Sequence, residues 1–203
     1  MFDDDIEDES NFPPSADSIN TDADDANDPN DDYGYFEREV EVTFLRAIKK
    51  NKVEVATFEL KSLRLAYNMD SADCAGAVFH SMMRLAVDTP HNSASELYRN
   101  AASIITKWKG VLGFYVKHID EQIEVIMKFE EMCQEDYAEL VPLFAQILHF
   151  LYDKDVVQED AILRWGEEKA GADESDKVYL IQSEAFIQWR KEASEEEDEE
   201  EDS

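Results

Sequence analysis

The sequence predicts an all-α protein of about eight helices, arranged as stacked antiparallel hairpins between acidic tails that stay disordered. Apolar residues recur at helical spacing through the middle of the chain, and no segment alternates convincingly as a strand. The helical segments are joined by short connections and contain no heptad run, which argues against a coiled coil. Together these observations favour a stack of helical hairpins.

Charge divides the chain into three parts. Residues 1–32 hold thirteen acidic residues and no Lys or Arg, and residues 192–203 hold nine acidic residues and no basic one. The formal net charge is −30, but in the middle 27 acidic residues face 19 basic ones. The first part has too few apolar residues to offset the loss of chain entropy on folding. We therefore expect a disordered acidic linker over residues 1–33, a helical domain over 34–193 and an acidic tail over 194–203.

The first three helices are predicted by apolar spacing and by their end signals. The first fades near Lys50 to Lys52 and carries apolar residues at intervals of four along one face. These residues are Phe36, Val40, Phe44 and Ile48. The second helix covers about Glu54 to Tyr67. The third starts after a cap at Asp70 or Ser71 and ends at Thr89-Pro90, because a residue before proline avoids the helical conformation.

The next two helices are separated by glycines. Ser93 or Ser95 can cap the fourth helix, since a serine hydroxyl accepts hydrogen bonds from the first free N–H groups. Gly110 and Gly113 are expected to interrupt the helical pattern before Ile119 to Cys133 resumes it.

The C-terminal helices complete the pattern. Pro142 falls in the first turn of an apolar helix that runs through Tyr152, where its missing N–H costs little. Two further helices lie near Gln158 to Lys169 and Ser175 to Glu192. Helix pairs of about 40 residues are typical of HEAT-type arrays. A compact irregular bundle is the alternative that the sequence leaves open.

The sequence lacks the signatures of a metal, nucleotide or nucleophile site. It contains no Gly-rich phosphate loop and no Gly-flanked serine nucleophile, and only six glycines in all. Its histidines lack the spacing of a metal site, so we expect them to be structural or solvated. They are His80, His91, His118 and His149. We expect no metal, no cofactor and no covalent catalysis.

Charge and hydropathy also narrow the partners. An acidic chain without a basic stripe repels phosphate, which disfavours direct binding of nucleic acid. No apolar run approaches the length of a membrane span, and the N-terminus does not have the form of a signal peptide. Cys74 and Cys133 are isolated within apolar helical patterns, as expected for buried thiols in a reduced compartment. We expect a cytoplasmic protein.

Two segments near the C-terminus share one design, in which large apolar residues run directly into clustered carboxylates. They are LYDKDVVQEDAILRWGEE, Leu151 to Glu168, and FIQWRKEASEEEDEEEDS, Phe186 to Ser203; we call them the first and second aromatic/acidic boxes. Acidic patches of this kind accelerate encounter with lysine-rich segments. The candidate partner-binding residues are Asp153, Asp155, Glu159, Asp160, Trp165, Glu167, Glu168, Trp189, Glu195, Glu196 and Glu197.

Each of these residues has a structural alternative. Trp165 is expected to pack the terminal helices, although partly exposed tryptophan is favoured as an interface anchor. The carboxylates solvate helix faces unless they share one binding surface. Ser194 is followed by three glutamates, a context that suits an acidophilic kinase, and is a candidate phosphorylation site. An unmodified serine is the default.

The chain resembles a known family along most of the predicted domain. The residues that carry the resemblance are FEREVEVTFLRAIKKN, FELKSLRLAYN, LYDKDVVQEDAILRW and FIQWRKEASEEE. They are similar to the C-terminal domain of the epsilon subunit of eukaryotic translation initiation factor 2B over about residues 35–203. The two boxes are also found in initiation factor 5 and in the C-terminal domain of factor 4 gamma. FELKSLRLAYN points to the epsilon subunit.

The resemblance implies a HEAT-type domain that acts as a guanine nucleotide exchange factor. Its substrate would be initiation factor 2 carrying GDP, with the GTPase centre on the gamma subunit and lysine-rich boxes on the beta subunit. In the family, the acid of a Leu-Glu pair is essential to exchange, and it matches Glu59. Phe58 stands where leucine is usual, and Thr43 and Ala66 match further sensitive positions. The resemblance thus implies Glu59, Phe58 and Thr43 as candidate catalytic residues.

Two departures from the family pattern affect fine contacts. Lys61 stands where related sequences often have asparagine, and Arg190 stands where leucine follows the box tryptophan. Without the resemblance, Glu59 would be read as a solvated acid on a helix face. With it, Glu59 is the candidate that competes for the phosphate-binding lysine or crowds the metal and phosphate with like charge.

Two functions therefore stay open. The first is an exchange-factor catalytic domain, and the second is an interaction module like the related domain of factor 5, which tethers factor 2 without opening its nucleotide site. The family's epsilon subunit also has a nucleotidyltransferase-like region and a left-handed β-helix, which nothing in this sequence resembles. We expect a C-terminal fragment whose contacts with the other subunits of factor 2B run through those regions.

Overall fold

The computed structural model describes residues 29–50, 52–174 and 177–201, with side chains described between Asp32 and Trp189. Every regular element in these ranges is helical, which confirms the predicted all-α class. The elements are α1 (Pro29–Lys50), α2 (Val53–Ala66), α3 (Ser71–Asp88), α4 (Ala94–Tyr115), α5 (Ile119–Glu135), the short 3₁₀ helix η1 (Ala138–Leu143), α6 (Phe144–Asp153), α7 (Glu159–Ala170) and α8 (Val178–Glu201).

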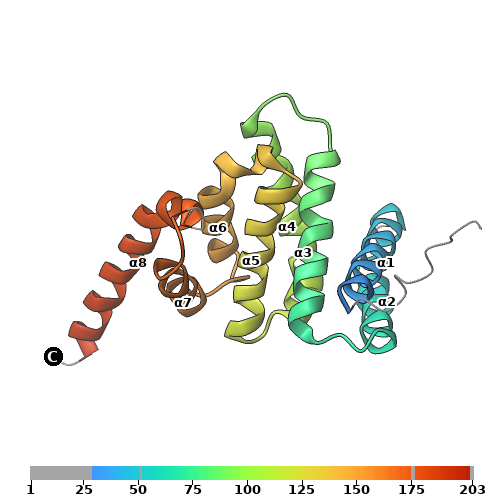
Figure 1. Ribbon diagram of the computed structural model, residues 1–203, viewed down its shortest axis with the longest axis horizontal. Coiled ribbons are helices and arrows are strands. Elements are labelled where there is room, and N and C mark those ends of the chain that lie inside the picture. Colours follow the sequence, from blue (N-terminus) through green and yellow to red (C-terminus); the bar gives the residue numbers. More distant parts are fainter. Residues whose placement is uncertain (1–28, 51, 175–176, 202–203) are drawn as a thin grey trace, which may run out of the picture.

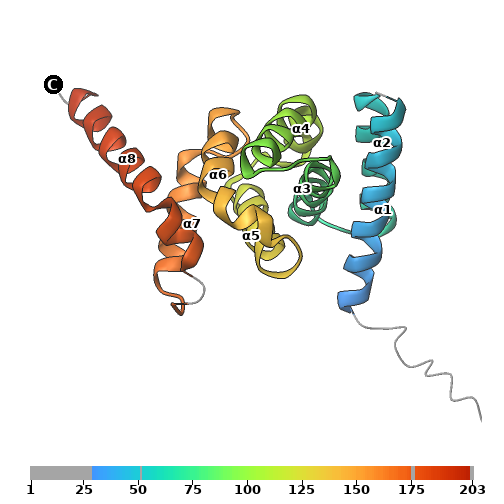
Figure 2. The same ribbon diagram turned by 90° about the horizontal axis from the view of Figure 1, so that it is seen from above.

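The helices stack as antiparallel hairpins, as the sequence predicts. The helices α1 and α2, α3 and α4, α5 and α6, and α7 and α8 pack in pairs. The odd-numbered helices contact one another in order from α1 to α7, and the even-numbered ones do so from α2 to α8. Figures 1 and 2 show the resulting row of helices, with α1 and α2 at one end and α7 and α8 at the other. This two-layered order distinguishes the HEAT-like stack from an irregular bundle.

The helix starts follow local capping chemistry. The Asp70 carboxylate accepts from the Asp73 N–H, and the Asp73 carboxylate accepts from the Asp70 N–H, both at 2.9 Å, so a reciprocal capping box opens α3. The Ser93 hydroxyl accepts from the Glu96 N–H and opens α4. Both caps are therefore at residues that the sequence singled out.

One predicted interruption is wrong. Gly110 and Gly113 lie inside α4, which is continuous to Tyr115. A glycine in a helix interior costs only about 1 kcal/mol relative to alanine. In α4 the buried side chains of Trp108 and Leu112 flank the glycines and hold the helix against the core.

Some helix bounds extend beyond the predicted patterns. The first helix begins at Pro29, upstream of Phe36 where its predicted apolar face starts, with proline in the first helical position where no N–H is needed. Pro142 lies in η1, directly before α6, rather than in the first turn of α6 itself. The last helix continues to Glu201 because no glycine or proline stops it and glutamate is a good helix former. Residues 1–28 and 202–203, to which the predicted tails extend, lie outside the described residues.

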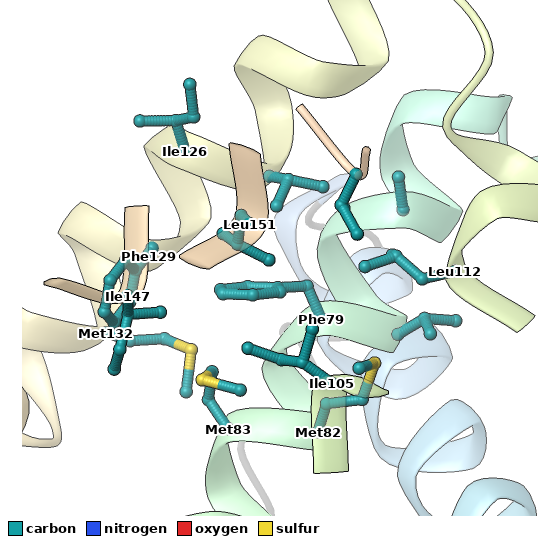
Figure 3. Close-up of a cluster of buried hydrophobic side chains, with 14 of the residues drawn as sticks. Phe79, Met82, Met83, Ile105, Leu112, Ile126, Phe129, Met132, Ile147 and Leu151 are labelled. Carbon is teal, nitrogen blue, oxygen red and sulfur yellow. The ribbon is translucent and has the colours of Figure 1, made fainter. Parts of the chain in front are cut away.

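Aromatic rings connect the layers of the core. Phe79 on α3 meets Phe129 on α5 at 5.6 Å between ring centroids, and Phe129 stacks on Phe144 of α6 at 4.7 Å. Phe144 in turn contacts Tyr179 of α8 at 4.6 Å. Figure 3 shows Phe79 and Phe129 among Met, Ile and Leu side chains from neighbouring helices. The stack therefore has one continuous core, which fixes the two end hairpins on a single scaffold.

Within the described residues, none of the helices combines the length and the apolar character needed to cross a membrane.

Candidate functional site

The α1–α2 hairpin presents apolar side chains at one end of the stack. Phe58 on α2 is 73% exposed, and Leu65, two turns further along the same helix, is also exposed. On α1, Val42 and Tyr35 are about half exposed. A terminal hairpin of a stacked array normally turns a polar face outward. This end of the molecule therefore has the composition of a contact surface.

Glu59 lies beside Phe58 on α2 with its side chain about one-third exposed. Its Oε2 atom lies 3.5 Å from Nη1 of Arg46 on α1, an ion pair in which the arginine is half exposed. Exposed pairs of this kind contribute only about 0–1 kcal/mol. Glu59 can therefore exchange Arg46 for another cation at low cost.

The other candidates at this end differ in accessibility. Thr43 is 4% exposed, so its hydroxyl lies in the core and does not face a partner. Thr43 therefore differs from Phe58 and Glu59, whose side chains reach the surface. Ala66 and Lys61 lie on exposed positions of α2.

Ion pairs hold α1 against the scaffold. Lys128 of α5 is buried, and its Nζ lies 3.1 Å from Glu37 Oε1 of α1 and 2.9 Å from Glu131 Oε1. Burial alone would lower the pKa of Lys128, but the Tyr33 hydroxyl and these two carboxylates outweigh it and raise the pKa above its ordinary value. Arg84 of α3 adds a hydrogen bond to Glu41 at 2.7 Å. The hairpin that carries Glu59 is thus fixed by charge as well as by apolar packing.

The first aromatic/acidic box surrounds the connection between α6 and α7. Asp153, Asp155 and Glu159 line a hollow of about 430 Å³ together with Tyr152, Val157 and Gln158. Asp155 has a positive φ of 56°, a conformation that aspartate tolerates better than most residues. The Gln122 side chain on α5 accepts from the Gln158 N–H at 2.6 Å and anchors this connection. Three of the predicted carboxylates therefore converge on one cavity.

Trp165 does not belong to that surface. It is 1% exposed and packs on Phe144 at 5.9 Å, and its indole N–H has no hydrogen-bond acceptor within the described residues. Its burial leaves little surface for contact with a partner and agrees with the packing alternative. The apolar face of α7 buries it because Ile162 and Gly166, its neighbours on that helix, also face the core.

Trp189 has the opposite environment. It is 51% exposed on α8, with its ring 6.2 Å from Phe186 and 6.3 Å from His149. These rings form an aromatic edge between α6 and α8. The two box tryptophans thus have different roles, one in the core and one at the surface.

Some of the remaining candidate carboxylates lie on the surface of α7, and the others lie beyond the residues whose side chains the structure describes. Asp160, Glu167 and Glu168 are on α7, where Asp160 and Glu167 are exposed and Glu168 accepts from Arg164 Nε at 3.2 Å. Arg164 also donates to Asp120 at 3.0 Å, so its positive charge is shared and neutralises the charge of Glu168 only in part. Ser194 and the candidates Glu195, Glu196 and Glu197 lie in the part of α8 whose side chains are outside the described residues.

The structure also places Glu167 beside residues that are not among the candidates from the sequence. A groove of about 270 Å³ lies between α7 and α8. It is lined by Leu163, Gly166, Glu167, Ala170, Leu180, Ile181, Glu184, Ile187 and Gln188. The groove had one signal in the sequence. Consecutive apolar residues stand at the start of α8, more than one buried helix face needs. Within the described residues, no three His, Cys, Asp or Glu side chains gather in a metal-binding group.

Residues 121–200 match a family described as W2: eIF4-gamma/eIF5/eIF2-epsilon. Translation initiation factor eIF2B subunit epsilon of Dictyostelium discoideum is 33% identical over 168 residues, which cover 80% of this chain and 24% of that protein. The same subunit of Schizosaccharomyces pombe is 25% identical over 192 residues, covering 94% and 27%. Eukaryotic translation initiation factor 5 of Caenorhabditis elegans is 37% identical over 76 residues, covering 36% and 17%. The chain spans about a quarter of the length of these epsilon subunits.

Proposed function

The chain belongs to the W2 family of translation initiation factor domains and is of the eIF2B epsilon C-terminal type, and from this premise we propose that it promotes GDP release from translation initiation factor 2. It would act as a guanine nucleotide exchange domain and form no covalent bond with its substrate. The end with Phe58 and Glu59 would act on the gamma-subunit GTPase. The end with the acidic boxes would hold lysine-rich segments of the beta subunit.

The observation that carries this proposal is where the similarity lies along the chain. The W2 match begins at residue 121, within α5, and so leaves out the α1–α2 hairpin. A continuous match over 80% of 203 residues has to include Glu59 wherever it begins. The hairpin therefore belongs to the part that resembles epsilon subunits, which favours exchange over simple tethering.

An exchange factor has to bind the nucleotide-free GTPase better than the loaded one. A GTPase holds GDP through a phosphate-binding lysine and Mg²⁺. The Glu59 carboxylate, carried on a helix and released from Arg46 at low cost, can pair with that lysine or repel the phosphate. Phe58, exposed beside it, supplies an apolar anchor that keeps the carboxylate in place.

The separation of the two ends supports a different function for each end. Figures 1 and 2 show α1 and α2 at the opposite end of the stack from α7 and α8. Acidic residues near α6, α7 and α8 would accelerate encounter with a lysine-rich segment. The rigid core between the ends would then present Glu59 to another part of the same partner.

A second candidate function rests on the similarity to initiation factor 5. A domain of that kind would bind factor 2 through its acidic boxes without opening the nucleotide site. The match to factor 5 covers 36% of this chain, compared with 80% for the epsilon subunit of Dictyostelium discoideum. Tethering thus accounts for the acidic end and leaves the exposed hairpin without a role.

The decisive experiment measures release of labelled GDP from factor 2. The parental chain is expected to accelerate release, and Glu59→Gln is expected to lose most of that acceleration while still binding factor 2. Glu54→Gln removes another exposed acid of α2 and serves as the matched control. Binding without acceleration by the parental chain would select the tethering function. An undiminished rate for Glu59→Gln would remove Glu59 from the mechanism.

Three further assignments follow from the same proposal. The chain would act in the cytoplasm, without direct contact with nucleic acid or a membrane. Contacts with other subunits of factor 2B would run through regions outside this sequence. Phosphorylation of Ser194 would add to the negative field of the second box, and a mass spectrum of the native protein without phosphate there would count against it.

A further inference from the structure

The groove between α7 and α8 is an apolar surface at the end of the stack. Ile181, on one wall, is 58% exposed, and Leu163 and Leu180 contribute further apolar surface. The groove does not require a glycine at position 166. A Cβ there would meet Leu180 Cδ1 at 3.5 Å and Ile187 Cδ1 at 3.6 Å, which are ordinary contact distances. Exposed aliphatic side chains around a groove are typical of a surface that another segment covers.

The position of the groove explains why it is uncovered. In the stack, each hairpin is covered by the next one, as α5 is by α7 and α6 by α8. The α7–α8 hairpin is the last one that the structure describes, and Figure 1 shows it at the end of the row. A helical segment laid on this groove would continue the stack by one layer.

The rim of the groove is acidic. Glu167 on α7 and Glu184 on α8 line it, and neither forms an ion pair within the described part of the chain. Two cations of α7 whose side chains the structure describes are already engaged: Lys169 pairs with Glu130 at 2.7 Å, and Arg164 pairs with Asp120 and Glu168. Glu167 and Glu184 are therefore suited to pair with cations of a partner.

We propose that this groove binds an amphipathic helical segment that carries apolar anchors on one face and lysines beside them. Its apolar side chains lie between Leu163 and Ile181, and its lysines pair with Glu167 and Glu184. The inference rests on the proposed binding of lysine-rich segments and makes it more specific. Charge alone brings the segment to the acidic end, whereas the groove selects a segment with the right apolar spacing.

The test compares two synthetic peptides with the same lysines. One has leucines at i, i+4 and i+7, and in the other these leucines are serines. The full 203-residue chain is expected to bind the leucine peptide at least tenfold more tightly. Ile181→Ser, at a half-exposed position that does not support the core, is expected to weaken binding of the leucine peptide about fivefold and leave the serine peptide unchanged. Met127→Ser, also exposed but outside the groove, is the matched control.

The outcomes separate this inference from the function on which it rests. Equal binding of both peptides overturns the groove assignment and leaves the electrostatic binding of lysines intact. Failure of both peptides to bind counts against the lysine-binding proposal itself. Sedimentation that shows a dimer dissociated by Ile181→Ser would assign the groove to a second copy of the chain and overturn the inference.

Discussion

Lys128 Nζ of α5 lies 3.1 Å from Glu37 Oε1 of α1, and this ion pair joins the hairpin that carries Glu59 to the centre of the stack. The lysine is buried, Glu131 provides a second carboxylate at 2.9 Å, and the Tyr33 ring lies 5.0 Å from Nζ. Glu37 and Tyr33 lie on α1, so the buried lysine keeps these two neighbours only while α1 stays in place. The pair therefore couples the position of α1 to the stability of the whole domain.

Replacing Lys128 with methionine is expected to destabilise the domain by about 3 kcal/mol, because Glu37 then keeps a largely buried charge without its partner. Urea unfolding measures this change. Lys61→Met, at an exposed position of α2, is expected to change stability by less than about 0.5 kcal/mol. In the double variant with Glu37→Gln, part of the loss is expected to return, and strict additivity of the two single losses would contradict the coupling.

Arg46 is expected to be dispensable for stability and for exchange. Its pair with Glu59 is exposed and long, at 3.5 Å, so Arg46→Gln is expected to lower the free energy of unfolding by less than about 1 kcal/mol. GDP release by this variant is expected to proceed at least at the parental rate, since Glu59 is freed for its partner. A rate as low as that of Glu59→Gln would show that Arg46 itself contacts the substrate complex.

The two box tryptophans are expected to respond differently to alanine. Trp165→Ala removes a fully buried ring and is expected to destabilise the fold by about 3–5 kcal/mol. Trp189→Ala removes a half-exposed ring and is expected to lower affinity for a lysine-rich peptide with little loss of stability. Thermal unfolding and peptide titration of both variants provide the comparison. Equal destabilisation by both would contradict the surface role of Trp189.

His91 is expected to make stability depend on pH near neutrality. Its hydrogen bond to the Thr89 carbonyl and its contact with Glu139 at 3.0 Å raise the pKa of His91 above its ordinary value of 6.5. The folded state therefore holds the proton more tightly than the unfolded chain does. The stabilisation is fully present below about pH 6.5 and is lost as pH rises through the raised pKa of the folded state.

Thermal melts of the parental chain and of His91→Gln test this dependence. The parental chain is expected to be the more stable at pH 6, with the difference shrinking towards pH 8. Glu139→Gln, which removes the carboxylate partner, is expected to flatten the profile in the same direction. A difference that stays constant over this range would assign His91 a packing role instead.

Local chemistry predicted most of the helices, because caps and apolar spacing act within one or two turns. The capping box at Asp70 and the cap at Ser93 are among the cap residues that the sequence offered. Gly110 and Gly113 were misjudged since their local cost is smaller than the packing of Trp108 and Leu112 against other helices. Burial of Trp165 and exposure of Trp189 follow from which layer covers each helix, and that information is not local.

The sequence by itself determined the all-α class, the acidic ends and the two boxes, since residue type and spacing carry this information. Glu59 became a candidate through the family resemblance of the segment FELKSLRLAYN. Only the tertiary structure decided that Thr43 and Trp165 lie in the core, that Glu59 and the boxes lie at opposite ends, and that an apolar groove with an acidic rim opens between α7 and α8. Those features depend on how helices distant in the sequence stack. Two helices can have the same apolar spacing, and stacking determines which of their faces is covered and which is exposed to a partner.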